Sequence, residues 1–336
     1  MFLVLFLLGL DLVGAEVQPT CTQLTGYRVC HRKGTLVDVT QEQSEDRLNI
    51  HDLDLLSIRE NAFKNLNTVK LSFSLGNKIS VVSRESFKGL EKLERLDLDS
   101  NVVPLSVNLF SELKQLRSLS LIFNKINQIP KDTFNGLNNL MFLYLGHNNI
   151  ESINEHSFSG LSSLSFLWLN DNKISNIEPG TFSDMRELTR LHLENNKLTS
   201  IQPGILRDLR KLDGLFLEQN QLTSISKNDF KGLHDLRILN LQQNQIVSIE
   251  DGAFWDLPQL EQLDLKNNLL TQINSNFFSG TTNLRKLDLS NNKISVMKTN
   301  AFTGLPALKS LYLANNKLAN VNRKALGLTS LTTVHT

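Results

Sequence analysis

The chain has 336 residues, of which 40% are hydrophobic, so it is long enough to bury a sizeable core. Its 35 lysines and arginines nearly balance its 34 aspartates and glutamates. This balance removes the usual electrostatic argument for a nucleic acid or an anionic membrane as partner, so any specificity must come from local patches.

The first fifteen residues, MFLVLFLLGLDLVGA, form an apolar run that is too short to span a bilayer. Small residues before Ala15 have the spacing of a signal-peptidase site, which predicts a signal peptide over residues 1–15 and a secreted, extracellular protein. The alternative is a buried N-terminal strand or helix, because no lysine or arginine precedes the run and Asp11 interrupts its end. No second long apolar segment follows, so we expect no transmembrane segment.

The only two cysteines, Cys21 and Cys30, lie just after the predicted cleavage site. A secreted chain meets an oxidising compartment, where such a pair forms a disulfide; the alternative is two free thiols. The segment CTQLTGYRVC lacks the pattern of the rest of the chain. We therefore predict a disulfide-linked N-terminal cap over residues 16–47.

Asparagine recurs along the rest of the chain at intervals of 24 residues, with one interval of 23. The series consists of Asn77, Asn101, Asn124, Asn148, Asn172, Asn196, Asn220, Asn244, Asn268, Asn292 and Asn316. Around each asparagine the chain reads LxxLxLxxNx(L/I), as in LTRLHLENNKL. Ten residues after most of them stands a phenylalanine, at Phe87, Phe134, Phe158, Phe182, Phe230, Phe254, Phe278 and Phe302.

The LxLxx part of each repeat alternates apolar and variable residues, which predicts a short strand with one face inward. Strands stacked at about 4.8 Å per repeat would form one parallel sheet. The asparagine side chain can bond turn amides that would otherwise be buried unpaired. No single coil can bury its own faces, so the coils must stack and the stack must be capped.

This pattern is the leucine-rich repeat signature, and it covers nearly the whole mature chain. The 24-residue period with a late phenylalanine resembles the typical class of extracellular leucine-rich repeat proteins. These include Toll-type receptor ectodomains, lamprey variable lymphocyte receptors, small leucine-rich proteoglycans, secreted leucine-rich glycoproteins and inhibitors of phospholipase A2. The resemblance implies an α/β-type solenoid, a curved horseshoe with a parallel β-sheet on its concave face and about 12 repeats over residues 48–336.

The frame is irregular near both ends. Leu53 stands where the first repeat would have asparagine, and three additional residues between Leu66 and Asn77 predict a bulge or a longer turn. The last segment, GLTSLTTVHT, begins another strand frame and lacks the cysteine-containing cap of many relatives. Either this strand caps itself, or another chain covers it, giving a homodimer through the uncapped C-terminal end, or the sequence is incomplete.

The sequence contains no motif for catalysis or metal binding. None of its seven histidines sits in HExxH, and GxSxG and Walker motifs are missing, so we expect no cofactor, no metal site and no enzyme. His147 and Asp171 stand one place before successive ladder asparagines and are expected to be neighbours. They form either a pH-sensitive binding pair or two solvated polar residues.

The outward strand positions lie six, four, two and one residues before each ladder asparagine, and in the middle repeats they are aromatic. We predict one patch of rings about three strand spacings, or roughly 15 Å, long. Charged residues, including Asp171, would surround it, as in a protein interface. The candidate ligand-binding residues are Phe123, Phe142, Tyr144, Phe166, Trp168, Arg190, His192, Glu194, Phe216 and Glu218. The alternative is that ring stacking merely stiffens the sheet.

The resemblance implies protein binding through the concave face, in innate immunity or enzyme inhibition. An extracellular-matrix or cell-adhesion role is the alternative and would favour homodimers. The fold does not choose among these roles.

Overall fold

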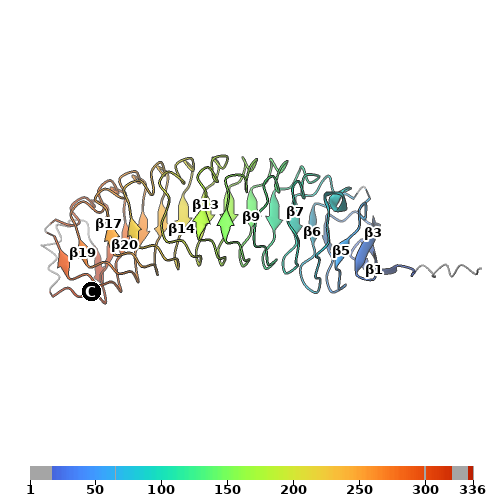
Figure 1. Cartoon of the computed structure of the whole chain (residues 1–336), viewed down its shortest axis with the longest axis horizontal. Coiled ribbons are helices and arrows are strands. Elements are labelled where there is room, and N and C mark those ends of the chain that lie inside the picture. Colours follow the sequence, from blue (N-terminus) through green and yellow to red (C-terminus); the bar gives the residue numbers. More distant parts are fainter. Residues whose placement is uncertain (1–16, 65, 299, 320–331, 336) are drawn as a thin grey trace, which may run out of the picture.

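A long, gently curved stack of coils makes up the protein (Figure 1). The computed structural model describes residues 17–64, 66–298, 300–319 and 332–335. The predicted signal peptide lies outside the described residues. The stack confirms the predicted solenoid, because each coil adds one short strand to a parallel sheet that runs along the whole arc.

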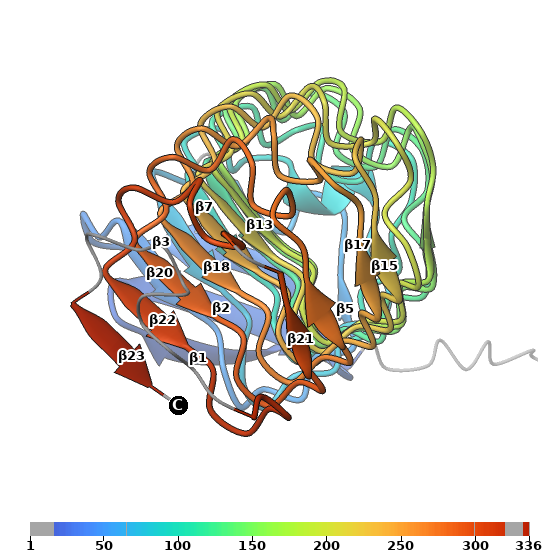
Figure 2. The same ribbon diagram turned by 90° about the vertical axis from the view of Figure 1, so that its left-hand side faces the viewer.

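The long sheet contains thirteen strands, arranged in chain order from β4 to β23. They are β4 (Arg47–Asn49), β6 (Lys70–Ser72), β7 (Arg95–Asp97), β8 (Ser118–Ser120), β9 (Phe142–Tyr144), β11 (Phe166–Trp168), β13 (Arg190–His192), β14 (Gly214–Phe216), β16 (Ile238–Asn240), β18 (Gln262–Asp264), β20 (Lys286–Asp288), β22 (Ser310–Tyr312) and β23 (Thr333–His335). The end-on view places this sheet on one side of the tube formed by the coils (Figure 2).

Short strand pairs line the opposite side of the tube (Figure 2). They are β10 (Ser152–Ile153) with β12 (Asn176–Ile177), β15 (Ser224–Ile225) with β17 (Ser248–Ile249), and β19 (Gln272–Ile273) with β21 (Val296–Met297). In the part of the chain that the structure describes, the returning halves are built mainly from turns. The one helix there is the 3-10 helix η1 (Arg84–Phe87).

The N-terminal segment forms a separate sheet. The strands β1 (Thr20–Leu24), β2 (Tyr27–Arg32) and β3 (Thr35–Gln41) pair antiparallel, and β5 (Ser57–Ile58) adds in parallel to β3. Cys21 and Cys30 face each other across β1 and β2 and form a disulfide. The Tyr27 ring is buried, and its hydroxyl donates to the Glu45 carbonyl at 2.6 Å. The boundary of the cap at residue 47 stays a prediction.

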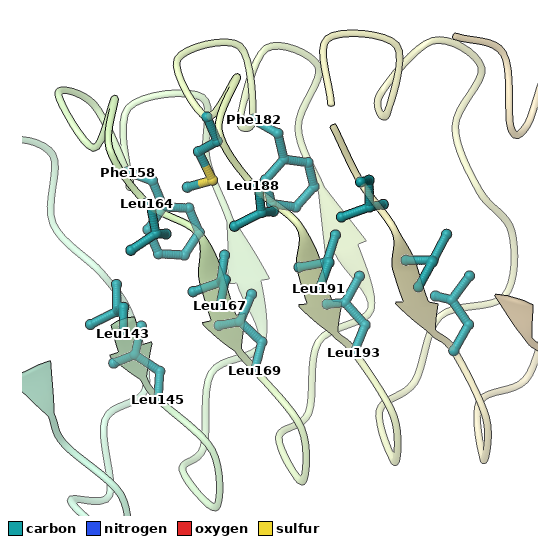
Figure 3. Packing of buried hydrophobic residues seen from close by; sticks show 14 of the residues in the cluster. Leu143, Leu145, Phe158, Leu164, Leu167, Leu169, Phe182, Leu188, Leu191 and Leu193 are labelled. Carbon is teal, nitrogen blue, oxygen red and sulfur yellow. The ribbon is translucent and has the colours of Figure 1, made fainter. Parts of the chain in front are cut away.

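Leucine alternation and the late phenylalanine fill the interior. Leu143 and Leu145 at β9, and Leu167 and Leu169 at β11, are fully buried and point into the tube (Figure 3). Strand geometry sends alternate side chains to opposite faces, so the residues between these leucines must face outward. On the other side of the interior, buried phenylalanines from successive coils contact one another, with ring centroids about 6 Å apart.

The asparagine ladder ties each coil to the one before it. Asn172 Nδ2 donates to the Leu169 carbonyl at 3.1 Å in its own turn and to the Leu145 carbonyl at 2.9 Å in the preceding coil. Asn172 Oδ1 accepts the Ile150 N–H at 3.0 Å. These buried backbone groups have no strand partner, so the side chain removes the cost of leaving them unpaired. The structural role predicted for the asparagines is thus confirmed and includes bonds between coils.

Both irregular regions are visible in the backbone. Between β6 and Asn77 the chain makes a longer turn, with positive φ at Leu75 (72°) and Gly76 (68°). A Cβ at position 76 would overlap the Asp52 backbone, so this turn requires glycine. At the other end, β23 pairs with β22, in agreement with the strand frame predicted there. Residues 320–331 lie outside the described part of the chain.

Candidate ligand-binding face

The outward side chains of four central strands line up in two columns. Phe142, Phe166, Arg190 and Gly214 occupy one register position on β9, β11, β13 and β14. Tyr144, Trp168, His192 and Phe216 occupy the register position two residues further on. Parallel in-register pairing therefore brings seven of the ten predicted site residues onto adjacent strands, and six of the seven place rings on one face.

The second column forms a continuous stack of four rings. Centroid distances are 4.3 Å from Tyr144 to Trp168, 5.4 Å from Trp168 to His192 and 4.3 Å from His192 to Phe216. The planes of each pair lie within about 13° of parallel. We call Tyr144, Trp168, His192 and Phe216 the central stack. Its rings follow the strand spacing, so each ring covers part of the next.

A second stacked pair lies beside the central stack. The Phe142 and Phe166 centroids are 5.1 Å apart, and the Phe166 ring lies 5.5 Å from that of Trp168. Each of these aromatic side chains is half-buried, because its faces contact the neighbouring rings. The patch thus presents mainly ring edges to solvent. Stacking also limits side-chain freedom, which lowers the entropy lost when a partner binds.

Phe123 lies outside these two columns. It is 55% exposed and stacks on His147, with centroids 4.5 Å apart. His147 Nε2 lies 3.5 Å from Asp171 Oδ2, so the predicted neighbours do meet. His147 was absent from the predicted site residues, although its place one residue before a ladder asparagine, like that of Phe123, was a signal for including it.

The residues one place before the ladder asparagines share a left-handed backbone. The φ values are 57° at Phe123, 54° at His147, 53° at Asp171, 52° at Asn195 and 55° at Gln219. This conformation turns the chain away from the sheet directly after the strand. It sets these side chains along the edge of the face, beside the central stack.

Arg190 lies across the surface of the sheet and forms an ion pair with Asp213 of the next coil. A Cβ at position 214 would stand 2.5 Å from Arg190 Nη1 and 3.1 Å from the Phe216 ring. Gly214 therefore leaves the space that the guanidinium group occupies. The sequence predicted Arg190 at the rim, but it did not identify Asp213, which precedes β14 by one residue.

Two glutamates border the central stack. Glu194 Oε1 lies 3.0 Å from His192 Nδ1. The Oε2 atoms of Glu194 and Glu218 are buried without a hydrogen-bond partner. Burial raises the pKa of Glu218 to about 7, and the negative charge of Glu194 adds to the rise. The two carboxylates thus lie next to rings, and each keeps one buried oxygen without a hydrogen bond that would offset its desolvation.

The rest of the face extends this acidic character. Burial raises the pKa of Asp264 on β18, and the neighbouring Asp288 adds to the rise. Burial also raises the pKa of Asp99, near β7. Both groups lie at outward positions on either side of the central stack. The face as a whole therefore combines stacked rings with several partly buried carboxylates.

The described residues contain no group of three or more histidine, cysteine, aspartate or glutamate side chains arranged to hold a metal ion. Within the same residues, no helix has the length and apolar character needed to cross a bilayer. The lack of a cofactor and of enzymatic activity stays a prediction. The half-buried rings and the carboxylates beside them share one outward face of the sheet.

Comparison with known proteins agrees with this architecture. A family described as leucine rich repeat matches residues 114–174, 167–222, 215–270 and 259–318, together more than half of the chain. No curated protein sequence matches the chain. The fold is similar to that of a leucine-rich repeat protein of Leptospira interrogans, at 28% identity and a TM-score of 0.66, covering 80% of this chain and 68% of that one.

Two further solved structures are similar. TLR13 in complex with the RNA ssRNA13 is 25% identical, with a TM-score of 0.69 over 86% of this chain. That match covers 49% of TLR13, so the present chain spans about half of its length. An internalin from Listeria monocytogenes is 21% identical, with a TM-score of 0.59 over 88% of this chain and 89% of that one, and it shows the fold alone.

Proposed function

Because the chain belongs to the leucine-rich repeat family, we propose that it is a secreted protein that binds a protein ligand through the central stack and its surroundings. The biological setting that we favour is innate immunity or enzyme inhibition. The observation that carries the proposal is the unbroken row of four parallel rings on one outward face, flanked by two glutamates that each have one buried oxygen without a hydrogen-bond partner.

The chemistry of the face suits a partner that presents a basic segment. An arginine or lysine of the partner would neutralise Glu194 and Glu218 through charge-assisted hydrogen bonds. The buried Oε2 atoms of both glutamates would gain the donor that they lack. Apolar side chains of the partner would cover the ring edges, which act as anchors in the centre of an interface.

The same chemistry argues against a nucleic-acid ligand on this face. Phosphate groups bind lysine and arginine, and each contact depends on neutralising their charge. Here the outward positions carry Asp99, Glu194, Glu218, Asp264 and Asp288. Towards the two ends of the sheet, outward positions also carry Arg95, Lys266 and Lys286. An RNA such as that in the TLR13 complex would therefore meet like charge in the middle of the face, where Glu194 and Glu218 border the rings.

The proposal is tested by affinity capture from extracellular fluid, with three versions of the chain as bait. The wild type and Trp255→Ala should retain the same partner, because Trp255 is 64% exposed and lies away from the sheet, in the turns of the opposite side. Trp168→Ala should lose it. With the captured protein in hand, direct titration should give an affinity loss of more than about 30-fold, which corresponds to roughly 2 kcal/mol.

The thermal stability of Trp168→Ala should change little, because its ring faces outward. If Trp168→Ala and Tyr144→Ala keep full affinity but melt at lower temperature, the rings stiffen the sheet and the partner binds elsewhere.

A further inference from the structure

The coil over residues 196–219 departs from its neighbours on the side opposite the long sheet. Where most coils place a buried phenylalanine, it has Leu206, between Phe182 and Phe230 in the series. Phenylalanine ring contacts run from Phe87 to Phe158 and again from Phe230 to Phe302. A leucine fills less volume than a phenylalanine, so this substitution leaves space in the core.

The backbone is also less tied at this coil. The strand pairs β10–β12 and β15–β17 flank it, but residues 199–202 form no strand of their own. At the irregular coil, the Thr223 N–H reaches the Thr199 carbonyl only at 3.4 Å. At the equivalent position one coil later, the Val247 N–H bonds the Thr223 carbonyl at 2.9 Å. The missing ladder bonds leave an opening on this side of the tube.

A cavity of about 50 Å³ lies at this opening. Its inner wall is apolar and includes Phe182 and Leu193, both of which point into the tube in Figure 3, together with Leu206 and Leu217. All four side chains are at most 3% exposed. The cavity is several times larger than the roughly 10 to 15 Å³ that one water molecule needs, but its apolar wall offers a water molecule no hydrogen-bond partner.

The mouth of the cavity is polar and uncharged. The exposed side chains of Asn176 and Gln202 lie there, with a separation of 3.4 Å between Gln202 Nε2 and Asn176 Oδ1. The hydroxyl of Ser200 adds a third hydrogen-bonding group. The lining contains no acidic or basic side chain, so the mouth would leave a charged head group without a partner.

We propose that this cavity binds the apolar end of a small neutral amphiphile, with two or three carbons against the leucine wall and a hydroxyl or amide head at the mouth. The site is independent of the sheet face and of any protein ligand there. Its ligand class follows from a dry apolar wall of limited depth and from a mouth with neutral donors and acceptors.

The test uses 1-butanol with two matched compounds, 1,4-butanediol and butyrate. Methyl NMR of the full chain should show saturable shifts at Ile201 and Ile205, which line the cavity, and not at Ile249, two coils away. We expect half-saturation on the order of 1 mM for a ligand of this size. Binding of 1,4-butanediol would bury its second hydroxyl group against the apolar wall, and binding of butyrate would place a carboxylate at a mouth without a charged partner. Both compounds should therefore bind at least tenfold more weakly than 1-butanol.

Two variants separate binding in the cavity from general solvent effects. Leu206→Phe restores the phenylalanine found in the flanking coils and fills the void, so it should weaken 1-butanol binding at least tenfold. Leu206→Ala enlarges the void and should bind 1-butanol at least threefold more tightly, which keeps the test valid if the phenylalanine variant does not fold. Equal affinity for 1-butanol and 1,4-butanediol, non-saturable shifts, or unchanged binding in the folded Leu206→Phe protein would each overturn the proposal.

Discussion

The guanidinium group of Arg190 occupies the space above Gly214 that any larger residue would fill. We therefore expect Gly214→Ala to move Arg190 away from Asp213 and to shift the Phe216 ring. Because the Arg190 side chain is flexible, stability should stay within about 0.5 kcal/mol of wild type. Affinity for the captured partner should fall about tenfold, and a crystal structure of the variant should reveal the displaced arginine.

Gly304→Ala is the control for that change, since a Cβ there has no atom within 4 Å. It should leave both affinity and the position of Arg190 unchanged. If Gly214→Ala binds the partner as tightly as the wild type although Arg190 is displaced in the crystal structure, then Arg190 is not part of the binding surface.

The ladder asparagines should matter far more for stability than other asparagines do. Asn172→Ala leaves buried groups of two coils, among them the Leu145 carbonyl and the Ile150 N–H, without their partner. We expect a loss of about 2 to 4 kcal/mol in urea denaturation. Asn135→Ala, which removes only an exposed bond to Asn108, should cost less than about 0.5 kcal/mol. Similar losses in the two variants would contradict the structural role of the ladder.

Two adjacent aromatic residues on the returning half, Phe254 and Trp255, should contribute very differently to stability. Phe254 is fully buried between the rings of Phe230 and Phe278, so Phe254→Ala should lower the free energy of unfolding by about 3 to 5 kcal/mol. Trp255→Ala removes a larger side chain that is 64% exposed and should cost less than about 0.5 kcal/mol. Calorimetry of both variants checks this contrast, which a reversed order would refute.

The raised pKa of Glu218 predicts a specific dependence of stability on pH. Its carboxyl titrates near 4.5 when unfolded and near 7 when folded, where it faces Glu194, His192 and Asp264. Between these values the folded state holds a proton that the unfolded state releases, so stability falls as the pH rises from about 4.5 to 7. Glu218→Gln has no such proton and should avoid this loss.

Melting temperatures of wild type and Glu218→Gln should therefore agree near pH 4.5 and separate as the pH rises. At pH 8 the variant should melt about 2 °C higher, which corresponds to roughly 1 kcal/mol once solvent screening of a part-exposed group is allowed for. Asp229, whose pKa burial raises to about 6, adds a loss of the same sign to both proteins and cancels in the comparison. A constant difference across the pH range would rule out the assigned pKa.

The repeat frame could be predicted in detail because few physical choices remain once leucine spacing is set. Leu143 and Leu145 had to be inside, and strand alternation then placed Tyr144 outside. Parallel stacking likewise predicted that Tyr144 and Trp168 would be neighbours. These steps need only the period of two along a strand and the period of 24 along the chain.

Other features depend on side-chain conformation and could not be predicted in this way. That the rings would stack in parallel, half-covering one another, depends on rotamers that spacing does not determine. Arg190 pairs with Asp213 of the next coil, and Asp213 lies outside the predicted columns. The cavity did leave a signal, because Leu206 interrupts the phenylalanine series, but only packing in three dimensions indicates whether neighbours close the gap.

The left-handed backbone before each ladder asparagine limits how this surface can evolve. At these positions the chain uses residues such as His147, Asp171, Asn195 and Gln219, with φ between 52° and 55°, and Phe123 at 57°. Valine, isoleucine and threonine would be strained there, because their branched Cβ crowds the backbone in this conformation. Nearly every side chain can therefore be accommodated at the outward strand positions, but only a reduced set at the positions just before the ladder asparagines. New binding specificities should arise mainly in the columns of Phe142 and Tyr144, and the edge should change more slowly.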